Sequence, residues 1–365
     1  MPTSVLLNER KMMRLLSLVA FLGLAMNVNA ATFVYVSMGP EQKIQIYRQD
    51  DTGGLTAIDS VSVAGAPGSL ATDPKRRILY ASLRTTSQLA SFQIEPASGK
   101  LTPLNTVDLV KGENAAFVGT DRTGRWLLSA SYSAGNVVVH RLRDDGSIEA
   151  PAVQTVTTAK TAHSVTIDRA NKLVMVPHVA PNAIFQFHFD SETGKLTDAG
   201  KVAGGTEEAG PRHLALHPKH DFAYSSDEKG SSITCYRLDA SRGLTVMQTV
   251  LTLPADFNAG NSTAEVKVHP NGKFVWVSNR GHDSLAGFAI DAATGHVSAI
   301  DRAPTEKTPR SFEIDPTGRF MFGAGEGSGK LAVFKVDAST GKLERIHTYE
   351  VGKSLSWVMA IETSP

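Results

Sequence analysis

Three ionisable side chains occupy equivalent places in three similar segments of this 365-residue chain. They are His163 in AHSVTI, Arg212 in PRHLAL and Arg310 in PRSFEI. A histidine titrates near neutral pH and can move a proton, and an arginine holds a carboxylate or phosphate through paired N–H donors. If the fold brings these positions together, we expect a site that binds an anionic group and carries out acid–base chemistry.

A short apolar strand recurs along the chain and indicates which fold would do so. Each copy is followed by a second strand, as in ITCYRLD at 233–239, and preceded by another, as in PRHLAL at 211–216. A period in the forties that contains only short strands is typical of propeller blades, whereas a helical solenoid would show a 3.6-residue pattern. The seven copies are FVYVS, ILYAS, LLSAS, LVMVP, FAYSS, FVWVS and FMFGA, which start at residues 33, 78, 127, 173, 222, 274 and 320.

This repeat predicts an all-β fold, a seven-bladed β-propeller of four-stranded antiparallel blades over residues 31–365. The chain would begin with the second strand of one blade and end with the first strand of that blade, at residues 356–361. The C-terminal strand would thus close the ring and remove the last exposed sheet edge. No Pro/Gly/Ser-rich linker interrupts the series, so we predict one domain.

Blade geometry turns the repeat into a candidate site. In a four-stranded meander, the first strand starts at the end of the blade where the second strand turns into the third, so residues at both places converge on one mouth of the channel. The second residues of the first strands are small in four blades and ionisable in three, which predicts a cavity: Gly68, Ala116, His163, Arg212, Ala264, Arg310 and Ser356. The next position adds His213 and Glu265. The loops contribute Gly39, Arg84, Ser133, Val179, Glu228, Arg280 and Glu326.

From this set we predict four catalytic and six substrate-binding residues. The catalytic candidates are His163, Glu228, Arg212 and Arg310. His163 and Glu228 are the types suited to general acid–base work, and either of them could be the base. The substrate-binding candidates are Arg280, His213, Glu265, Arg84, Ser133 and Glu326. No metal or other cofactor is expected, since the sequence has no HExxH, paired CxxC or EF-hand spacing.

Other residues that attract attention have structural interpretations. His217 and His269 each begin a tight turn, at positions where other blades have aspartate, and are predicted to be turn residues. The single cysteine, Cys235, lies in a strand and is expected to be buried and inert. The segment GAGEGSGK at 323–330 is similar to a phosphate-binding loop, but it is expected to be a hairpin rather than a strand-to-helix turn.

The charges balance, with 37 Lys and Arg residues against 36 Asp and Glu residues. No strong net field would gather nucleic acid or an anionic membrane, so neither is an expected partner. The N-terminus differs from the rest, because Arg10, Lys11 and Arg14 precede an apolar run over 15–26 and a small-residue signal at 28–30. This pattern predicts a secretory signal peptide over residues 1–30 and a periplasmic or secreted protein with no membrane insertion after cleavage.

The chain resembles the propeller-type 6-phosphogluconolactonases and the related carboxymuconate-lactonising enzymes. The resemblance covers residues 32–362, and its most telling segments are ASYSAGNVVVHRL, AHSVTI, AGPRHLALHP with FAYSSDE, AEVKVHPNGKFVWVSNRGHDSL and PTEKTPRSFEIDPTGRF. It implies a site on one face in which His163, Arg212, Glu228 and Arg310 bind substrate or transfer protons, with Arg280 beside them. Two segments depart from the family, AYSSDE where YVVNE is usual and VPHVAPN where a VPDLG-like loop is common.

Residues and resemblance together predict hydrolysis of a sugar lactone by base-activated water, with arginines that stabilise the oxyanion. Export would separate the protein from phosphorylated sugars in the cell, so an unphosphorylated aldonolactone stands beside 6-phosphogluconolactone as the substrate. Two other functions stay open. One is a muconate-type cycloisomerase, and the other is a non-catalytic propeller that binds a ligand or a protein, since a fold alone does not prove catalysis.

Overall fold

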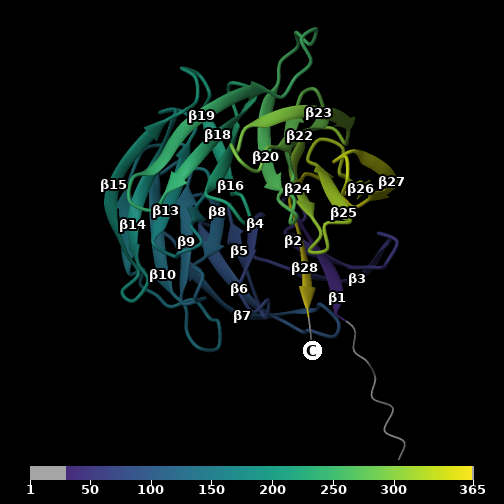
Figure 1. Ribbon diagram of the computed structural model, residues 1–365. Helices are drawn as coiled ribbons and strands as arrows, with labels where there is room; N and C mark the ends of the chain where they lie inside the picture. The colour runs from purple at the N-terminus through teal and green to yellow at the C-terminus, as the bar shows by residue number, and fades with distance from the viewer. Residues whose placement is uncertain (1–29, 364–365) are drawn as a thin grey trace, which may run out of the picture.

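The computed structural model describes residues 30–363, in which the chain forms 28 β-strands and no helix. The strands make seven four-stranded antiparallel sheets that stand in a ring (Figure 1), so the predicted all-β seven-bladed propeller is confirmed. The predicted signal peptide at 1–30 lies outside the described residues, apart from Ala30. In the described range no helix is long and apolar enough to cross a membrane.

Each blade has four strands in the same order from the axis outward. Neighbouring innermost strands contact one another around most of the ring. These innermost strands are β4 (Pro67–Thr72), β8 (Ala115–Thr120), β12 (Thr166–Ile167), β16 (Pro211–Leu216), β20 (Ser262–Val268), β24 (Pro309–Ile314) and β28 (Leu355–Thr363). The second strands are β5 (Ile78–Leu83), β9 (Trp126–Ser131), β13 (Leu173–His178), β17 (Phe222–Asp227), β21 (Phe274–Arg280), β25 (Phe320–Gly325) and β1 (Ala31–Met38).

The third and fourth strands complete the blades toward the rim. The third strands are β6 (Gln88–Ile94), β10 (Asn136–Arg141), β14 (Ala183–Asp190), β18 (Ser232–Asp239), β22 (Ser284–Ile290), β26 (Lys330–Val336) and β2 (Lys43–Gln49). The outermost strands are β7 (Leu101–Asp108), β11 (Gln154–Thr157), β15 (Lys195–Ala203), β19 (Gly243–Leu251), β23 (Val297–Pro304), β27 (Leu343–Glu350) and β3 (Leu55–Ser62). We number the blades 1 to 7 in chain order, beginning with the blade that contains β1.

Both ends of the described chain lie in blade 1. Its innermost strand is β28 and its second strand is β1, and the two are antiparallel neighbours from the Ala31–Thr363 pair onward. The last strand of the chain therefore supplies the inner edge that β1 would otherwise leave open, as predicted. The ring closes by ordinary backbone hydrogen bonds, and blade 1 is the only blade assembled from distant parts of the described chain.

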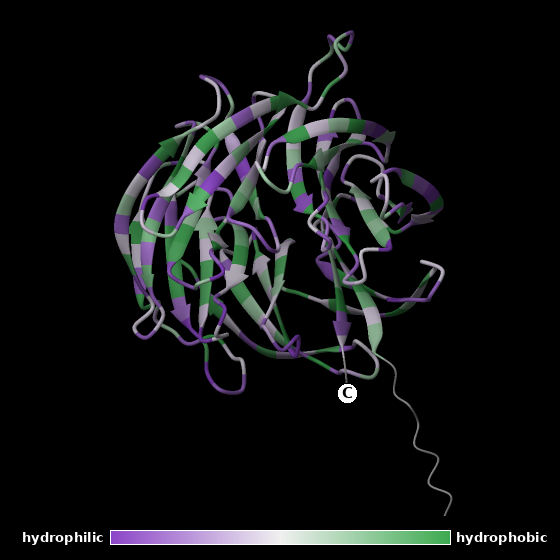
Figure 2. Ribbon diagram, in the orientation of Figure 1, coloured by the Kyte–Doolittle hydropathy of each residue, from purple (hydrophilic) through white to green (hydrophobic). Residues whose placement is uncertain are grey.

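The apolar core lies between blades rather than in one central mass. Seven buried clusters are present, and each joins two neighbouring blades. In one of them Phe33 and Tyr35 of blade 1 pack against Leu79 and Ala81 of blade 2. The outermost strands are largely exposed, and Figure 2 shows hydrophilic and hydrophobic residues alternating along β15 at the rim. Because the apolar side chains pack between neighbouring blades, polar side chains can line the end of the channel.

A glycine in the outer hairpin of one blade contacts an aromatic ring of the preceding blade. Gly99 of blade 2 has a positive φ of 69°, and a Cβ at this position would overlap the ring of Phe33 in blade 1. Gly194 of blade 4 has the same relation to Trp126 of blade 3. Only glycine fits both the backbone conformation and the contact.

We therefore expect Gly99→Ala to destabilise the protein by about 1–3 kcal/mol, because overpacking adds to backbone strain. Urea unfolding followed by tryptophan fluorescence measures the change. Gly112→Ala is the matched control, because Gly112 also has a positive φ, 89°, but has no atom within 4 Å of the added Cβ. Equal losses in the two variants would show that the contact with Phe33 contributes nothing.

The two histidines predicted to be turn residues do hold turns. Nδ1 of His217 accepts hydrogen bonds from two backbone N–H groups of its own turn, and its Nε2 lies 2.8 Å from the carbonyl oxygen of Gly272 in the next blade. His269 makes the equivalent bond to Gly318. Cys235 is fully buried, as expected. None of these residues reaches the site described below.

Candidate functional site

A small pocket lies on the channel axis, at the end of the ring where the innermost strands begin. Its volume is about 10 Å³, on the order of the space that one water molecule needs. The residues around it come from blades far apart in the chain and include six of the seven positions predicted from the repeat. The lining residues are Gly68, Ser69, Arg84, Ala116, His163, Arg212, Arg310, Ser356 and Trp357.

Irregular strand pairing turns these residues toward the axis. The pairing of β16 with β17 shifts between Pro211 and His213, so Arg212 lies in a bulge. The pairing of β24 with β25 shifts in the same way around Arg310. Similar shifts occur in β4, β8, β20 and β28. A bulge re-aims side chains that regular alternation would send to opposite faces, and bulges are common beside functional sites.

Small residues on one side of the pocket make room for a long side chain. A Cβ at Gly68 would lie 2.8 Å from Cδ of Arg84, so the absence of a side chain lets Arg84 lie across the start of β4. Nε of Arg84 donates a hydrogen bond of 2.6 Å to Oδ1 of Asn114. Burial lowers the pKa of Arg84, and the nearby charge of Arg310 acts in the same direction. Two guanidinium groups that repel each other at one pocket favour an anionic ligand.

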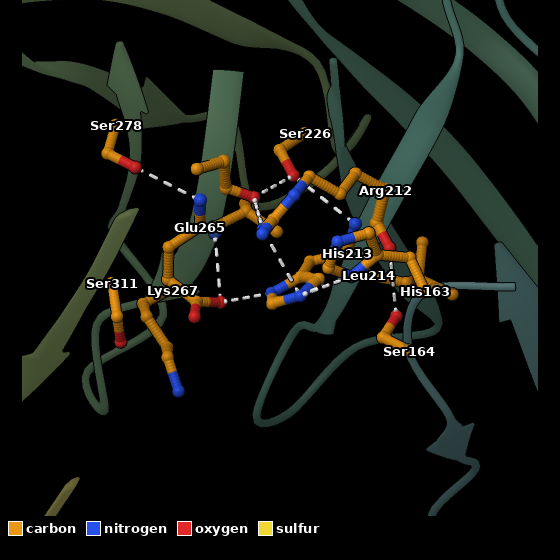
Figure 3. A network of polar contacts seen from close by, with 12 residues as sticks. His163, Ser164, Arg212, His213, Leu214, Ser226, Glu265, Lys267, Ser278 and Ser311 are labelled. Atoms are coloured by element: carbon orange, nitrogen blue, oxygen red, sulfur yellow. Dashed lines mark hydrogen bonds and ion pairs between the residues drawn. The ribbon is translucent and has the colours of Figure 1, made fainter. Parts of the chain in front are cut away.

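Three side chains form a connected row that leads away from the pocket (Figure 3). Nδ1 of His163 lies 3.2 Å from Nε2 of His213, and Nδ1 of His213 lies 2.8 Å from Oε1 of Glu265. All three residues are buried. His213 and Glu265 do not line the pocket, so they lie behind His163 rather than beside it. His163 lines the pocket, and its Nε2 makes no hydrogen bond to the described residues.

Burial decides the protonation states in this row. Burial lowers the pKa of His163 well below its usual value, and the charges of Arg212 and Arg310 act in the same direction. Burial also lowers the pKa of His213 to about 4. Both imidazoles are therefore neutral at pH 7. Burial alone would raise the pKa of Glu265, but the hydrogen bond from His213 and the charge of Lys267 outweigh it, and Glu265 is a carboxylate.

Arg212 is the most enclosed charge at the site, with 1% of its surface exposed. Its Nη1 donates to the carbonyl oxygen of Ala264 at 2.8 Å and lies 3.2 Å from Nε2 of His213. Its Nε lies 3.0 Å from Oε2 of Glu228, although the N–H is not aligned as a hydrogen bond. Burial and the charges of Arg310 and Arg280 lower its pKa, yet a guanidinium remains protonated in proteins. Nη2 of Arg212 makes no hydrogen bond or ion pair with the described residues.

The remaining charged candidates, Glu228, Arg280 and Glu326, lie beside the axial pocket without lining it. Oε2 of Glu228 lies 3.4 Å from Nη2 of Arg280 as well as beside Arg212, so this carboxylate holds two guanidinium groups. Nη1 of Arg310 lies 3.8 Å from Oε2 of Glu326. Glu228 and Arg280 are close to the axial pocket but do not line it. Within residues 30–363, no group of three or more His, Cys, Asp and Glu side chains is arranged to hold a metal ion.

A wider hollow adjoins the axial pocket between blades 1 and 2. Its volume is about 430 Å³, within the range of small-molecule sites. The two spaces share Arg84 and Ser356. The lining residues of the hollow are Gly39, Pro40, Gln42, Ala66, Pro67, Arg84, Thr85, Asn114, Glu326, Ser354 and Ser356. A ligand of the size of a sugar could therefore lie in the hollow and reach the axial pocket with one end.

One predicted residue does not join the site, and two others do without having been predicted. Ser133 is exposed and donates to the carbonyl oxygen of Gly112. Strand β9 ends one residue early relative to the repeat, so Tyr132 takes the inward place and its ring lies 5.5 Å from that of His163. Trp357 of the closing strand also lines the pocket. The sequence could have indicated Trp357, because it directly follows Ser356, which the repeat places at the channel.

Comparison with known proteins identifies the family to which the chain belongs. A family model described as "Lactonase, 7-bladed beta-propeller" matches residues 32–360, almost the whole described chain. The chain belongs to the seven-bladed β-propeller lactonase family. The predicted family is confirmed, and the relatives of this lactonase fit it along nearly their full length.

Two curated relatives and one solved structure illustrate the similarity. The 6-phosphogluconolactonase of Pectobacterium carotovorum is 34% identical over 334 residues, 90% of this chain and 98% of the relative. The 6-phosphogluconolactonase of Serratia proteamaculans is 33% identical over 89% of this chain and 97% of the relative. A periplasmic gluconolactonase of Pseudomonas aeruginosa superposes with a TM-score of 0.84 at 25% identity and covers 92% of this chain and 99% of its own.

Proposed function

We propose that this lactonase hydrolyses a sugar lactone, 6-phosphogluconolactone or an unphosphorylated aldonolactone, with His163 as the general base. One observation carries the proposal: His163, a neutral imidazole whose Nε2 makes no hydrogen bond to the described residues, lines a water-sized pocket together with Arg84, Arg212 and Arg310. A base, a place for one water molecule and several cations are the groups that hydrolysis of an ester bond needs.

In the proposed reaction the lactone ring lies in the hollow and its carbonyl group points to the axis. His163 takes a proton from the water as the water oxygen bonds to the carbonyl carbon. Arg212 and Arg310 stabilise the negative oxygen of the tetrahedral intermediate. The intermediate then breaks the bond to the ring oxygen, which receives the proton from His163, and the product is an open-chain hydroxy acid. Glu228, held between Arg212 and Arg280, keeps both guanidinium groups in place.

Two lines of support bear on where the protein works. The N-terminal pattern at residues 1–30 is that of an exported protein, and one solved relative is described as periplasmic. We therefore propose a periplasmic or secreted location, in which an unphosphorylated lactone is the more accessible substrate. Mass spectrometry of the protein from the periplasmic fraction tests the location, because cleavage would leave an N-terminus at residue 31.

The decisive assay compares three lactones with the purified mature protein. We expect acceleration of the opening of gluconolactone or 6-phosphogluconolactone and none of a muconolactone. Acceleration of the muconolactone reaction alone would favour the cycloisomerase. A bound lactone that is not turned over would favour a binding function.

Arg84 provides a test of whether the substrate is phosphorylated. Arg84 lines the hollow, and its outer guanidinium nitrogens make no hydrogen bond to the described residues, so they are available to a substituent of the lactone. If the natural substrate carries a phosphate, Arg84→Gln should raise KM for the phosphorylated lactone ~10-fold, the equivalent of one lost contact of about 1.4 kcal/mol. Steady-state kinetics on both lactones measures it.

The matched control for Arg84→Gln is Arg242→Gln, at an arginine whose side chain is 85% exposed and far from the mouth. This control should leave KM unchanged for both lactones. If Arg84→Gln raises KM equally for gluconolactone and for 6-phosphogluconolactone, Arg84 does not contact the phosphate. Arg84 would then only support the shape of the pocket.

A further inference from the structure

The row Glu265, His213 and His163 crosses three blades, from β20 through β16 to the residues that precede β12. Each member lies within hydrogen-bond distance of the next, and only His163 lines the pocket. We propose that Glu265 and His213 are positioning residues that hold His163 in the one tautomer in which Nε2 is a base. This inference rests on the proposed function of His163.

Glu265 lies at the far end of the row, and its carboxylate can only accept hydrogen bonds. Its Oε1 lies 2.8 Å from Nδ1 of His213, so the proton of His213 is on Nδ1. Oε1 also accepts from the backbone N–H of Val266 at 3.2 Å, which fixes the direction of the carboxylate. Lys267, paired with Glu313 at 2.9 Å, lies nearby and favours the ionised form of Glu265.

The second step concerns the other nitrogen of His213. Nη1 of Arg212 carries only hydrogens and lies 3.2 Å from Nε2 of His213, so this nitrogen must present a lone pair. One hydrogen of Nη1 is directed to the carbonyl oxygen of Ala264, and the other is left for His213. A protonated Nε2 would place two donors face to face. His213 is therefore the neutral Nδ1–H tautomer.

The tautomer of His213 determines the tautomer of His163. Its Nδ1 lies 3.2 Å from Nε2 of His213, and two unprotonated ring nitrogens at that distance would repel each other. Since Nε2 of His213 has no proton, Nδ1 of His163 carries one. The N–H groups of His163 and Arg212 then both donate to the lone pair on Nε2 of His213. The proton of neutral His163 is then on Nδ1, and the lone pair is on Nε2, toward the pocket.

The same row stabilises the product of proton transfer. When His163 takes a proton from water, its imidazolium keeps Nδ1–H directed at His213, whose own Nδ1–H is directed at the Glu265 carboxylate. The positive charge that forms close to Arg212 and Arg310 is thus partly balanced through the row. A buried negative partner of this kind is what orients and supports a general base.

Nitrogen NMR of the mature protein labelled with ¹⁵N-histidine tests the assignment without any lactone. Spectra of His163→Gln and His213→Gln identify the two residues. We expect both rings to be protonated on Nδ1 and unprotonated on Nε2 at neutral pH. A resting protein in which His163 carries its proton on Nε2 would overturn the inference, even if the protein hydrolyses lactones. If the tautomers are as expected but the protein hydrolyses no lactone, the result would contradict only the proposed function.

Kinetics of Glu265→Gln provide the second readout, because an amide can donate to Nδ1 of His213 and reverse the tautomers. We expect kcat to fall about 10- to 100-fold, the usual effect of losing a partner behind a reacting group, with KM changed less than about 2-fold. Glu313→Gln is the control, since it removes a largely buried carboxylate of the innermost strand β24 that contacts Lys267 and no histidine. Equal losses of kcat in both variants would show that Glu265 contributes only negative charge, and would refute the positioning role.

Discussion

Replacing His163 by glutamine should lower kcat for lactone hydrolysis about 10²- to 10⁴-fold, the range that a general base contributes. Glutamine has a similar length and can still donate to His213, so the row behind it and the fold should persist. Steady-state kinetics with gluconolactone, together with circular dichroism and thermal unfolding, measures both consequences. His282→Gln is the control, because His282 lies on the same face against Phe257 and outside the pocket.

The pH profile adds an independent check on His163. A base works only when it is unprotonated, and a lowered pKa keeps His163 neutral to a pH below the usual histidine value of 6.5. The charged groups that face it, Arg212 and Arg310, favour the neutral form, and His213 beside it is itself neutral at these pH values. Therefore kcat/KM should stay flat from pH 8 down to 6.5 and decline only below that. An activity that is half lost near pH 6.5 or above, or a His163→Gln variant within about 3-fold of wild type, would contradict His163 as the base.

Replacing Arg212 by lysine should lower kcat about 10²- to 10³-fold, the cost of removing one oxyanion donor. Lysine keeps the charge, but a single ammonium group cannot contact the Ala264 carbonyl, Glu228 and the substrate at once, whereas the planar fork of arginine can. Because substrate binding depends less on this donor than the tetrahedral intermediate does, KM should change less than kcat. Single-turnover and steady-state kinetics separate the two effects.

Arg302→Lys is a suitable control for Arg212→Lys. Arg302 also donates to backbone carbonyls, those of Thr252 and Leu253, but it belongs to β23 at the rim and does not line either space at the mouth. Its activity should remain within about 2-fold of wild type. A loss of less than about 5-fold in the Arg212 variant would mean that Arg310 alone stabilises the oxyanion.

The ring and the pocket were predictable from one periodic signal. Once seven strands recur at blade spacing, closed geometry places His163, Arg212 and Arg310 on one axis, and the structure has them there. The small residues Gly68 and Ala116 were equally informative, because the space they leave lets the charged side chains meet. Periodicity thus predicts which positions face the channel, since symmetry makes them equivalent.

Details that break the symmetry could not be predicted from it. Ser133 and Tyr132 exchange places because β9 ends one residue early, and repeat alignment has no signal for a local strand end. His213 and Glu265 were predicted to bind substrate because they directly follow the axial positions of the repeat, but they do not line the pocket. Their place behind His163 depends on the pairing of side chains across blades, which spacing along the chain does not encode.

The pairing of β28 with β1 also determines when the molecule can become whole. A ribosome makes β1 first and β28 last, so every unfinished chain has an open flank in blade 1 and an incomplete mouth. Folding to the functional state is consequently a post-synthetic event, because the final strand must join the opening one over the longest loop that the chain allows.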